Sequence, residues 1–288
     1  MAHQLAFARG PEMTKIIVFT DLHMLADGGR IIGLDPYERL LKGIRHVNLC
    51  HPDAARVMLT GDLADDGSEA AYRRLRELLC EFEVPYSLMV GNHDYRPAFS
   101  RVFPEAPSDA HGFIQTAIDI DSRYRLVLLD TLNGPPRRGV EHHAGYLCAR
   151  RLDWLDRQLG SSGRRRVVLF MHHPPHDTGF PGMDAIRLAN AAALYRLLAR
   201  HGNVRHIFSG HVHRMIAGSA HGIPFSIFKS PVHQQPMDLA SSDTSLSIDE
   251  PAAYGIVLLR RDAIVVHTED YGLPTVPPRL PASSVQTG

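Results

Sequence analysis

Five short apolar runs in the sequence each end in a cluster of Asp, Asn or His residues. Runs of this length, several of them rich in Val and Ile, are typical of strands that are buried on both faces. Because ligand sites in α/β proteins collect beyond the carboxyl ends of such strands, the pattern predicts one shared polar site. The five runs are Lys15–Thr20, Arg56–Thr60, Tyr86–Val90, Val167–Met171 and Val204–Phe208.

Amphipathic segments with a helical period separate these runs. The alternation of strands and helices predicts an α/β fold with helices outside a sheet. The predicted helices are Asp35–Asn48, Ser68–Phe82, Ala149–Leu159 and Asp184–Arg200. The further predicted strands are an antiparallel pair, His111–Ile120 with Tyr124–Asp130, and the late strands Ile223–Lys229, Tyr254–Arg260 and Ala263–Thr268.

The residues that follow the five runs are of types that bind metals. They are Asp21-Leu22-His23, Gly61-Asp62, Gly91-Asn92-His93-Asp94, His172-His173-Pro174 and Gly210-His211-Val212-His213. Carboxylate, amide and imidazole ligands without a thiolate suit Zn, Fe, Mn or Co rather than Ca or an iron–sulfur cluster. Seven such side chains are too many for one tetrahedral ion and suit two metals that share a carboxylate, about 3.5–4 Å apart. Taken singly, each could instead be an ordinary turn residue.

The order Asp-x-His, Gly-Asp, Gly-Asn-His-Asp, His-x-Pro and Gly-His-x-His resembles that of the calcineurin-like metallophosphoesterases, over residues 14–214. The resemblance implies a four-layer α/β/β/α sandwich of two mixed sheets, with a binuclear metal site at the sheet edge. Four stretches resemble the class III cyclic-nucleotide and glycerophosphodiester phosphodiesterases: Phe170–Pro175, Met183-Asp184, Ile207–His211 and Val232–Gln234. This implies hydrolysis of a small phosphodiester by attack of a metal-bound hydroxide on phosphorus, with two divalent or trivalent Fe, Zn, Mn or Co ions.

The resemblance also implies a role for each residue of the site. Asp21, His23 and His213 would bind the first metal, Asn92, His172 and His211 would bind the second, and Asp62 would bridge them. Asn92 and His93 would contact the substrate, and His93 would stabilise or protonate the leaving oxygen. Asp94 would orient the His93 ring. His233 would lie at the substrate end of the pocket, and Thr131 would lie near Asn92.

Several of these residues have a simpler interpretation. His93 could be a structural histidine bonded to a carbonyl, Asp94 a cap or turn residue, and His233 an ordinary loop residue. His173 is adjacent to a ligand, and its side chain should face away from the site. Four other histidines have no spacing that converges on the site and are expected at the surface: His46, His51, His142 and His143.

Other functions remain open on the sequence alone. A phosphomonoesterase or a nuclease of the same superfamily would use the same ligands, and a non-catalytic scaffold would keep the fold after losing some of them. Lys and Arg together number 31, as do Asp and Glu, so the net charge of +0 argues against a nucleic-acid polymer as substrate. No apolar run approaches the length of about 20 residues that spans a membrane. Three cysteines without a CxxC spacing predict a cytoplasmic protein.

One metallophosphoesterase domain is expected over residues 14–270, with residues 271–288 as a tail. Met13 stands directly before the first predicted strand and is an alternative start to Met1. Residues 230–255 form an unusually long connection, and such connections commonly serve as lids or binding loops. We expect this segment to close the pocket or to form a contact in a homo-oligomer.

Overall fold

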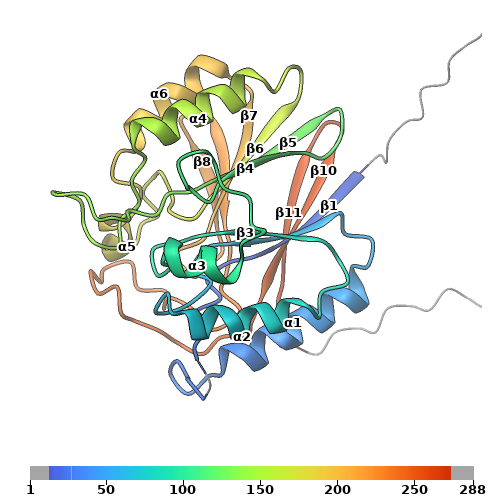
Figure 1. Ribbon diagram of the computed structural model, residues 1–288, viewed down its shortest axis with the longest axis vertical. Helices are drawn as coiled ribbons and strands as arrows, with labels where there is room; N and C mark the ends of the chain where they lie inside the picture. Colours follow the sequence, from blue (N-terminus) through green and yellow to red (C-terminus); the bar gives the residue numbers. More distant parts are fainter. Residues whose placement is uncertain (1–12, 27, 274–288) are drawn as a thin grey trace, which may run out of the picture.

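Two mixed β-sheets form the centre of the computed structural model, which describes residues 13–26 and 28–273 (Figure 1). The first sheet contains, in spatial order, β11 (Ile264–Glu269), β10 (Tyr254–Arg260), β1 (Met13–Phe19), β2 (Arg56–Thr60) and β3 (Tyr86–Met89). The second contains β4 (Thr116–Asp119), β5 (Tyr124–Leu129), β6 (Arg166–Met171), β7 (Val204–Ser209), β9 (Ile223–Ile227) and β8 (Ile216–Ala220). In the first sheet, β2 pairs in parallel with β1 on one side and β3 on the other. In the second sheet, β5 with β6, β6 with β7 and β7 with β9 are parallel pairs. The remaining pairs are antiparallel.

Helices cover the outer face of each sheet. α1 (Pro36–Cys50), α2 (Glu69–Leu79) and α3 (Arg96–Val102) pack on the first sheet, and α4 (Ala149–Gly160) and α6 (Ala191–His201) pack on the second. Figure 1 shows these two groups of helices on opposite sides of the sheets. The short α5 (Pro181–Ala185) packs near Val212 and Ile227. The predicted four-layer α/β/β/α sandwich is therefore confirmed.

Alternation along β1 explains why its sequence is apolar throughout. Ile16 and Val18 point into the layer between the sheets, where they join Phe170 and Phe208 of the second sheet. The residues between them along the strand, such as Ile17, face the helices instead. Both faces of the strand are buried, so a continuous apolar run is the pattern that such a strand requires.

The structure differs from the predicted elements in a few places. The helix predicted over Asp184–Arg200 is broken: residues 186–190 are not helical, and Leu188 instead pairs with Gly145 in an isolated bridge. Asn190 holds this arrangement, because its side-chain amide bonds to both the N–H and the carbonyl of Leu147. The elements α3, α5 and β8 were not predicted: the two helices are too short for a helical period to show, and β8 contains Gly218 and Ser219 where an apolar run would be expected.

The boundary between domain and tail also needs correction. Tyr271 was assigned to the tail, but it is buried against Phe19 and Tyr254, and its hydroxyl donates to the carbonyl of Arg39 at 2.9 Å. The folded domain therefore extends at least to residue 271, because the last strand leads directly into this packing. The part of the predicted tail from residue 274 onward lies outside the described residues, as does Met1.

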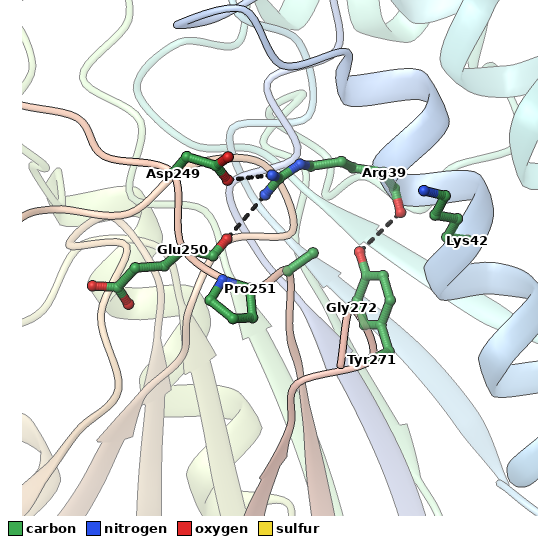
Figure 2. A pocket seen from close by; sticks show the side chains of 8 residues that line it. Arg39, Lys42, Asp249, Glu250, Pro251, Tyr271 and Gly272 are labelled. Atoms are coloured by element: carbon green, nitrogen blue, oxygen red, sulfur yellow. Dashed lines mark hydrogen bonds and ion pairs between the residues drawn. The ribbon is translucent and has the colours of Figure 1, made fainter. Parts of the chain in front are cut away.

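Arg39 of α1 holds the long connection between β9 and β10, which we call the 230–250 segment. Its guanidinium donates to the carbonyls of Val232 at 2.8 Å and Glu250 at 3.0 Å, and pairs with the Asp249 carboxylate. Figure 2 shows this guanidinium reaching the segment beside a cavity of about 350 Å³, with Lys42 nearby on the same helix. Both ends of the segment are thus fixed to one helix.

Replacing Arg39 by Met should loosen the 230–250 segment. Hydrogen bonds to a charged group contribute about 1.5–3 kcal/mol each, so we expect amide exchange or limited proteolysis within the segment to accelerate at least about tenfold. Lys42→Met is the matched control, because Lys42 makes no hydrogen bond or ion pair with any described residue. Equal rates for the two variants would show that Arg39 does not restrain the segment.

Candidate metal centre and active site

The seven predicted ligands lie together at one end of the two sheets. Each follows the carboxyl end of a strand, and both sheets contribute. Asp21 and His23 follow β1, Asp62 follows β2, Asn92 follows β3, His172 follows β6, and His211 and His213 follow β7. The topology alone therefore explains why residues separated by about 190 positions come into contact.

The Asp62 carboxylate lies at the centre of this group. Its Oδ2 is 3.1 Å from His172 Nε2 and 3.8 Å from His23 Nε2. Beyond His23, the Nε2 of His213 lies 3.0 Å from the Nε2 of His23. Beyond His172, the side-chain oxygen of Asn92 lies 3.1 Å from the Nε2 of His172. One carboxylate thus faces two separate sets of ligand atoms.

Asp21 lies between the two sets. Its Oδ1 is 3.5 Å from His213 Nε2 and 3.8 Å from His172 Nε2, and both its oxygens accept from the backbone N–H of His211. Three groups of side chains have ligand atoms within 4.8 Å of one another: Asp62 with His172 and His211, His23 with His213 and His233, and His23 with Asp62 and His93.

Hydrogen bonds fix which imidazole nitrogen faces the centre. The Nδ1 of His172 bonds to the Thr60 carbonyl at 3.0 Å, and that of His213 bonds to the His233 carbonyl at 3.1 Å. The Nδ1 of His23 lies 2.9 Å from the Asp65 carboxylate. An acceptor at Nδ1 keeps the proton on that nitrogen, so Nε2 is left with its lone pair toward the site.

The backbone at the site is held in an unfavourable conformation. Five of the seven candidate ligands have a positive φ, which non-glycine residues rarely adopt: Asp21 (56°), His23 (43°), Asp62 (47°), His211 (72°) and His213 (52°). Each such residue costs about 1–3 kcal/mol and is tolerated only where the surrounding structure enforces it, most often at functional sites. The clustering therefore points to this end of the sheets as the functional site.

Two glycines allow the strand ends to approach closely. A Cβ at Gly91 would overlap the Asp62 carboxylate and lie 2.7 Å from His172 Nε2. A Cβ at Gly210 would overlap the Thr20 hydroxyl. Both positions border the ligands, so any larger residue would displace a side chain of the centre.

Burial and charge set the protonation of the ligands. Burial lowers the pKa of His211 to about 3 and holds that of His213 well below its ordinary value, so both rings are neutral and able to bind a metal. Burial opposes a charge on His172 as well, but the Asp62 and Asp21 carboxylates raise its pKa to about 9. Although burial opposes ionisation of Asp62 too, the His172 and His93 imidazoles hold its pKa well below its ordinary range.

His93 borders the ligands and faces the pocket. Its backbone N–H donates to Asp62 Oδ1 at 2.9 Å, and its Nδ1 lies 2.7 Å from the carbonyl oxygen of Asp65. Nδ1 therefore carries a proton, and Nε2 is the nitrogen that can face a substrate. Asp65 was not among the predicted residues. Because it also binds His23, it orients one ligand and His93 together, yet it stands in a loop with no motif of its own.

The prediction that Asp94 orients the His93 ring is wrong. Asp94 is buried, and its carboxylate accepts from the N–H groups of Gly91 (2.8 Å), Leu63 (3.1 Å) and Ala64 (3.1 Å) and from the Tyr72 hydroxyl (2.8 Å). These four bonds occupy its acceptor positions, so none is left for His93. Asp94 instead joins the loop after β2 to the loop after β3, which positions Asp62 beside Asn92.

His143 is exposed, as expected of a surface histidine, but its contacts with the site were not predicted. Its ring stacks on His93 with centroids 5.3 Å apart, and its Nδ1 lies 3.2 Å from the Asn92 side-chain nitrogen. It comes from the loop between β5 and α4, and no sequence motif marks its position in that loop. His142 is exposed as expected, whereas His46 and His51 are half-buried near Tyr254.

The remaining candidates lie in two places. His233 faces the cluster, with its ring centroid 4.5 Å from that of His213. His173 is in none of the three ligand groups and is buried, bonding at Nδ1 to the Thr131 hydroxyl at 2.7 Å and at Nε2 to the His143 carbonyl at 3.1 Å. Thr131 thus bonds to His173 rather than to Asn92, and it supports the loop that carries His143.

A cavity of about 320 Å³ lies over the ligands. His23, Asp62, Asn92, His211 and His213 line it, and Thr244, Ser245, Leu246 and Ser247 of the 230–250 segment form part of its wall.

The side chains present fit a pair of metal ions. The Nε2 of His211 is buried and has no hydrogen-bond partner among the described residues, which is costly unless another group satisfies it. The donor set of imidazole, carboxylate and amide suits transition metals. A buried ring without a partner, next to two buried carboxylates, is the arrangement that bound cations would complete.

Comparison with known proteins shows which family and which relatives this chain is similar to. Residues 14–215 match the model of the family described as calcineurin-like phosphoesterase. A probable cyclic nucleotide phosphodiesterase of Rhodopseudomonas palustris is 43% identical over 254 residues, covering 88% of this chain and 91% of the relative. A probable glycerophosphodiester phosphodiesterase of Arcobacter nitrofigilis is 28% identical over 265 residues, covering 90% and 91%.

A solved structure shows a similar fold. The dimetal phosphatase of Danio rerio superposes with a TM-score of 0.67 at 19% identity, covering 88% of this chain and 95% of the other. Among the described residues, no helix is both long and apolar enough to cross a membrane.

Replacing Gly91 by Ala should disrupt the centre without unfolding the protein. The added methyl group would press on both the Asp62 carboxylate and the His172 ring, so we expect a loss of at least half of the bound metal. Metal analysis of the purified variant, with circular dichroism to verify folding, measures this. Gly163→Ala is the control, since a Cβ there meets nothing within 4 Å, although its φ of 62° adds some strain. Full metal content in Gly91→Ala would contradict the expectation.

Proposed function

Since the chain belongs to the calcineurin-like phosphoesterase family, we propose that it is a metal-dependent phosphodiesterase that hydrolyses a small phosphodiester at the Asp62 centre. The observation that carries the proposal is the position of Asp62, whose single Oδ2 lies 3.1 Å from one imidazole and 3.8 Å from another. Two relatives whose names state cyclic nucleotide and glycerophosphodiester phosphodiesterase activities support the reaction class.

We assign the ligands to two metal positions that share Asp62. Asp21, His23 and His213 would hold the first ion, and Asn92, His172 and His211 the second. The close contacts on either side of Asp62 support this division. When bound, the two ions supply Lewis-acid stabilisation of the phosphoryl charge and lower the pKa of water. Fe, Zn, Mn and Co all suit this donor set.

His93 is the residue that we propose to act on the leaving group. Its Nδ1–H is bonded to the Asp65 carbonyl, so its Nε2 faces the departing oxygen and, when the ring is in its imidazolium form, can donate a proton to it. His143 packs on the ring and limits its rotation. Asn92 would contact the phosphoryl group from its place between His172 and His143, and His233 would contact the substrate from the other side.

Other classes of function fit the structure less well. A non-catalytic scaffold would have no need of seven converging ligands and strained backbone at five of them. A phosphomonoesterase or nuclease would use the same ligands, but the balanced charge gives no support to a polymer substrate. The free cysteines Cys50, Cys80 and Cys148 are in keeping with a cytoplasmic location. Because residues 244–247 of the 230–250 segment line the cavity, we favour a lid within one chain over a contact between subunits.

Replacing Asp62 by Ala should abolish activity and the two-metal stoichiometry. Asp62 is the ligand that we assign to both ions, so its removal leaves neither set complete. Metal analysis of the purified variant and hydrolysis of bis(p-nitrophenyl) phosphate measure the effect, with exposed Asp153→Ala on α4 as control. A variant that still held two ions per chain with wild-type turnover would overturn the proposal.

Replacing His93 by Ala should lower turnover about 10²–10⁴-fold while metal content stays unchanged. Because p-nitrophenolate leaves without being protonated, the loss should be smaller for p-nitrophenyl esters than for alkyl diesters. The comparison of kcat for the two ester types measures this, and exposed His267→Ala on β11 is the control. Equal losses for both types would argue for positioning rather than proton transfer.

A further inference from the structure

The Asn92 side chain can bind a metal ion in only one of its two orientations. The oxygen of an amide has lone pairs to offer a cation, whereas its nitrogen carries two hydrogens and acts only as a donor. The Asn92 oxygen lies 3.1 Å from His172 Nε2, beside the ligands that we assign to the second ion. A half-turn of the amide would bring the nitrogen there instead. Asn92 therefore needs a partner that holds its nitrogen on the other side.

His143 is that partner. The Nδ1 of its ring lies 3.2 Å from the Asn92 side-chain nitrogen, and no other residue in the described part of the chain bonds to this nitrogen. An N–H group can be donated only to a ring nitrogen that holds no proton, so the contact places the proton of His143 on Nε2. The ring then accepts from the amide nitrogen, and the amide oxygen is left for the second ion.

Buried His173 holds the loop that carries His143. Its Nε2 lies 3.1 Å from the His143 carbonyl oxygen, which accepts, so Nε2 carries the proton and donates. Complete burial favours the neutral ring, whose Nδ1 then accepts from the Thr131 hydroxyl at 2.7 Å. The two bonds fix both the tautomer of His173 and the position of the His143 backbone.

The rest of the loop is anchored in the same place. A Cβ at Gly145 would stand 2.6 Å from Cγ of His173, so the absence of a side chain lets the ring pack against the loop. The Tyr146 N–H donates to the Thr131 carbonyl at 3.0 Å, and the Gly145 carbonyl accepts from the Ala189 N–H at 2.8 Å. The loop is thus fixed by side-chain and backbone bonds together, which lets it orient a ligand before an ion binds.

We propose that His143 is a positioning residue, which keeps the oxygen of Asn92 turned toward the second ion, and that His173 acts through it by holding its loop. The inference rests on the proposed function, because that function assigns Asn92 as a ligand. It gives a role to two histidines that belong to none of the three ligand groups. Loss of a supporting partner of this kind typically lowers metal affinity about 10–100-fold.

Two substitutions separate the acceptor of His143 from its ring. His143→Asn places an oxygen where Nδ1 stands but removes the ring, whereas His143→Phe keeps a ring that can stack on His93 but offers no acceptor. The metal-free full chain is titrated with Mn²⁺ alone, and the electron paramagnetic resonance signal of unbound Mn²⁺ gives the affinity of each binding step. Asn92→Ala identifies the step to which Asn92 contributes.

We expect His143→Phe to weaken the step that depends on Asn92 about 10–100-fold and to leave the other step within about twofold. His143→Asn should stay within about threefold of the wild-type chain in both steps, because the acceptor is restored. His142→Ala is the matched control, since this neighbour is exposed in the same loop, and it should change neither step. Circular dichroism verifies that each variant is folded.

The same logic applies to His173. His173→Gln keeps a donor where Nε2 stands, whereas His173→Leu removes it. The Leu variant should weaken the step that depends on Asn92 at least about threefold, and the Gln variant should weaken it less. Since a substitution at so buried a residue can unfold the chain, the exposed His143 variants decide the proposal if His173→Leu does not fold.

NMR of the metal-free chain gives a readout that depends on neither metal nor activity. Long-range correlations between ring protons and ring nitrogens distinguish a protonated imidazole nitrogen from a bare one. We expect the neutral rings of His143 and His173 both to carry the proton on Nε2. A proton on Nδ1 of His143 would overturn the proposal, because that nitrogen could not then accept from Asn92.

The outcomes distinguish this inference from the proposed function. If the wild-type chain binds two Mn²⁺ ions but hydrolyses no diester, the proposed function fails, and the Mn²⁺ affinities still decide the role of His143. If diesters are hydrolysed but His143→Phe binds both ions as the wild-type chain does, the inference is overturned. It is overturned as well if His143→Asn loses as much affinity as His143→Phe. Binding of fewer than two ions by the wild-type chain would overturn both.

Discussion

Two carboxylates with almost no contact with water, Asp21 and Asp62, set the requirement that the rest of the site meets. A buried charge without compensation carries a penalty of several kcal/mol. Here the compensation comes from imidazoles, backbone N–H groups and a donor set suited to metal ions, gathered from both sheets. The four-layer architecture is what makes this possible, because strands from two sheets end at one place. The fold thus places the strand ends side by side, and the two buried carboxylates require positively charged or hydrogen-bonding groups there.

Most of the strained non-glycine backbone lies at the same end of the molecule, where strand ends also approach each other closely. Positive φ angles at five candidate ligands and the absence of side chains at Gly91 and Gly210 are two consequences of bringing strand ends together. Stability must then come from elsewhere, and it does: aromatic residues such as Phe170 and Phe208 fill the layer between the sheets. Asp94 has a similar supporting part, since its four bonds join two ligand loops.

The sequence predicts the strands and the candidate ligands well, because both depend on local patterns. A strand buried on both faces has a continuous apolar sequence in any sheet of this kind, so it can be recognised without knowledge of its neighbours. The family match over residues 14–215 confirms the family that the motif blocks indicate. Asp65 and His143 could not be predicted, since each acts from a loop whose position depends on distant contacts. The break in the helix near Asn190 could not be predicted for the same reason. The sequence there has a helical period, but the hydrogen bonds of the Asn190 side chain to Leu147 hold the chain in a non-helical conformation. The direction of the Asp94 side chain likewise depended on Tyr72, 22 residues away.

The ion pair of Asp130 with Arg96 ties the two sheets together beside the candidate ligands. Asp130 directly follows β5 of the second sheet, and Arg96 begins α3, shortly after Asn92. Arg96 also donates to the Leu132 carbonyl, while Asp130 accepts from the Leu132 N–H, so both side chains hold the loop after β5. The loop of Asn92 and His93 is therefore anchored to the opposite sheet, and a substitution at Asp130 would change the position of Asn92 without touching it.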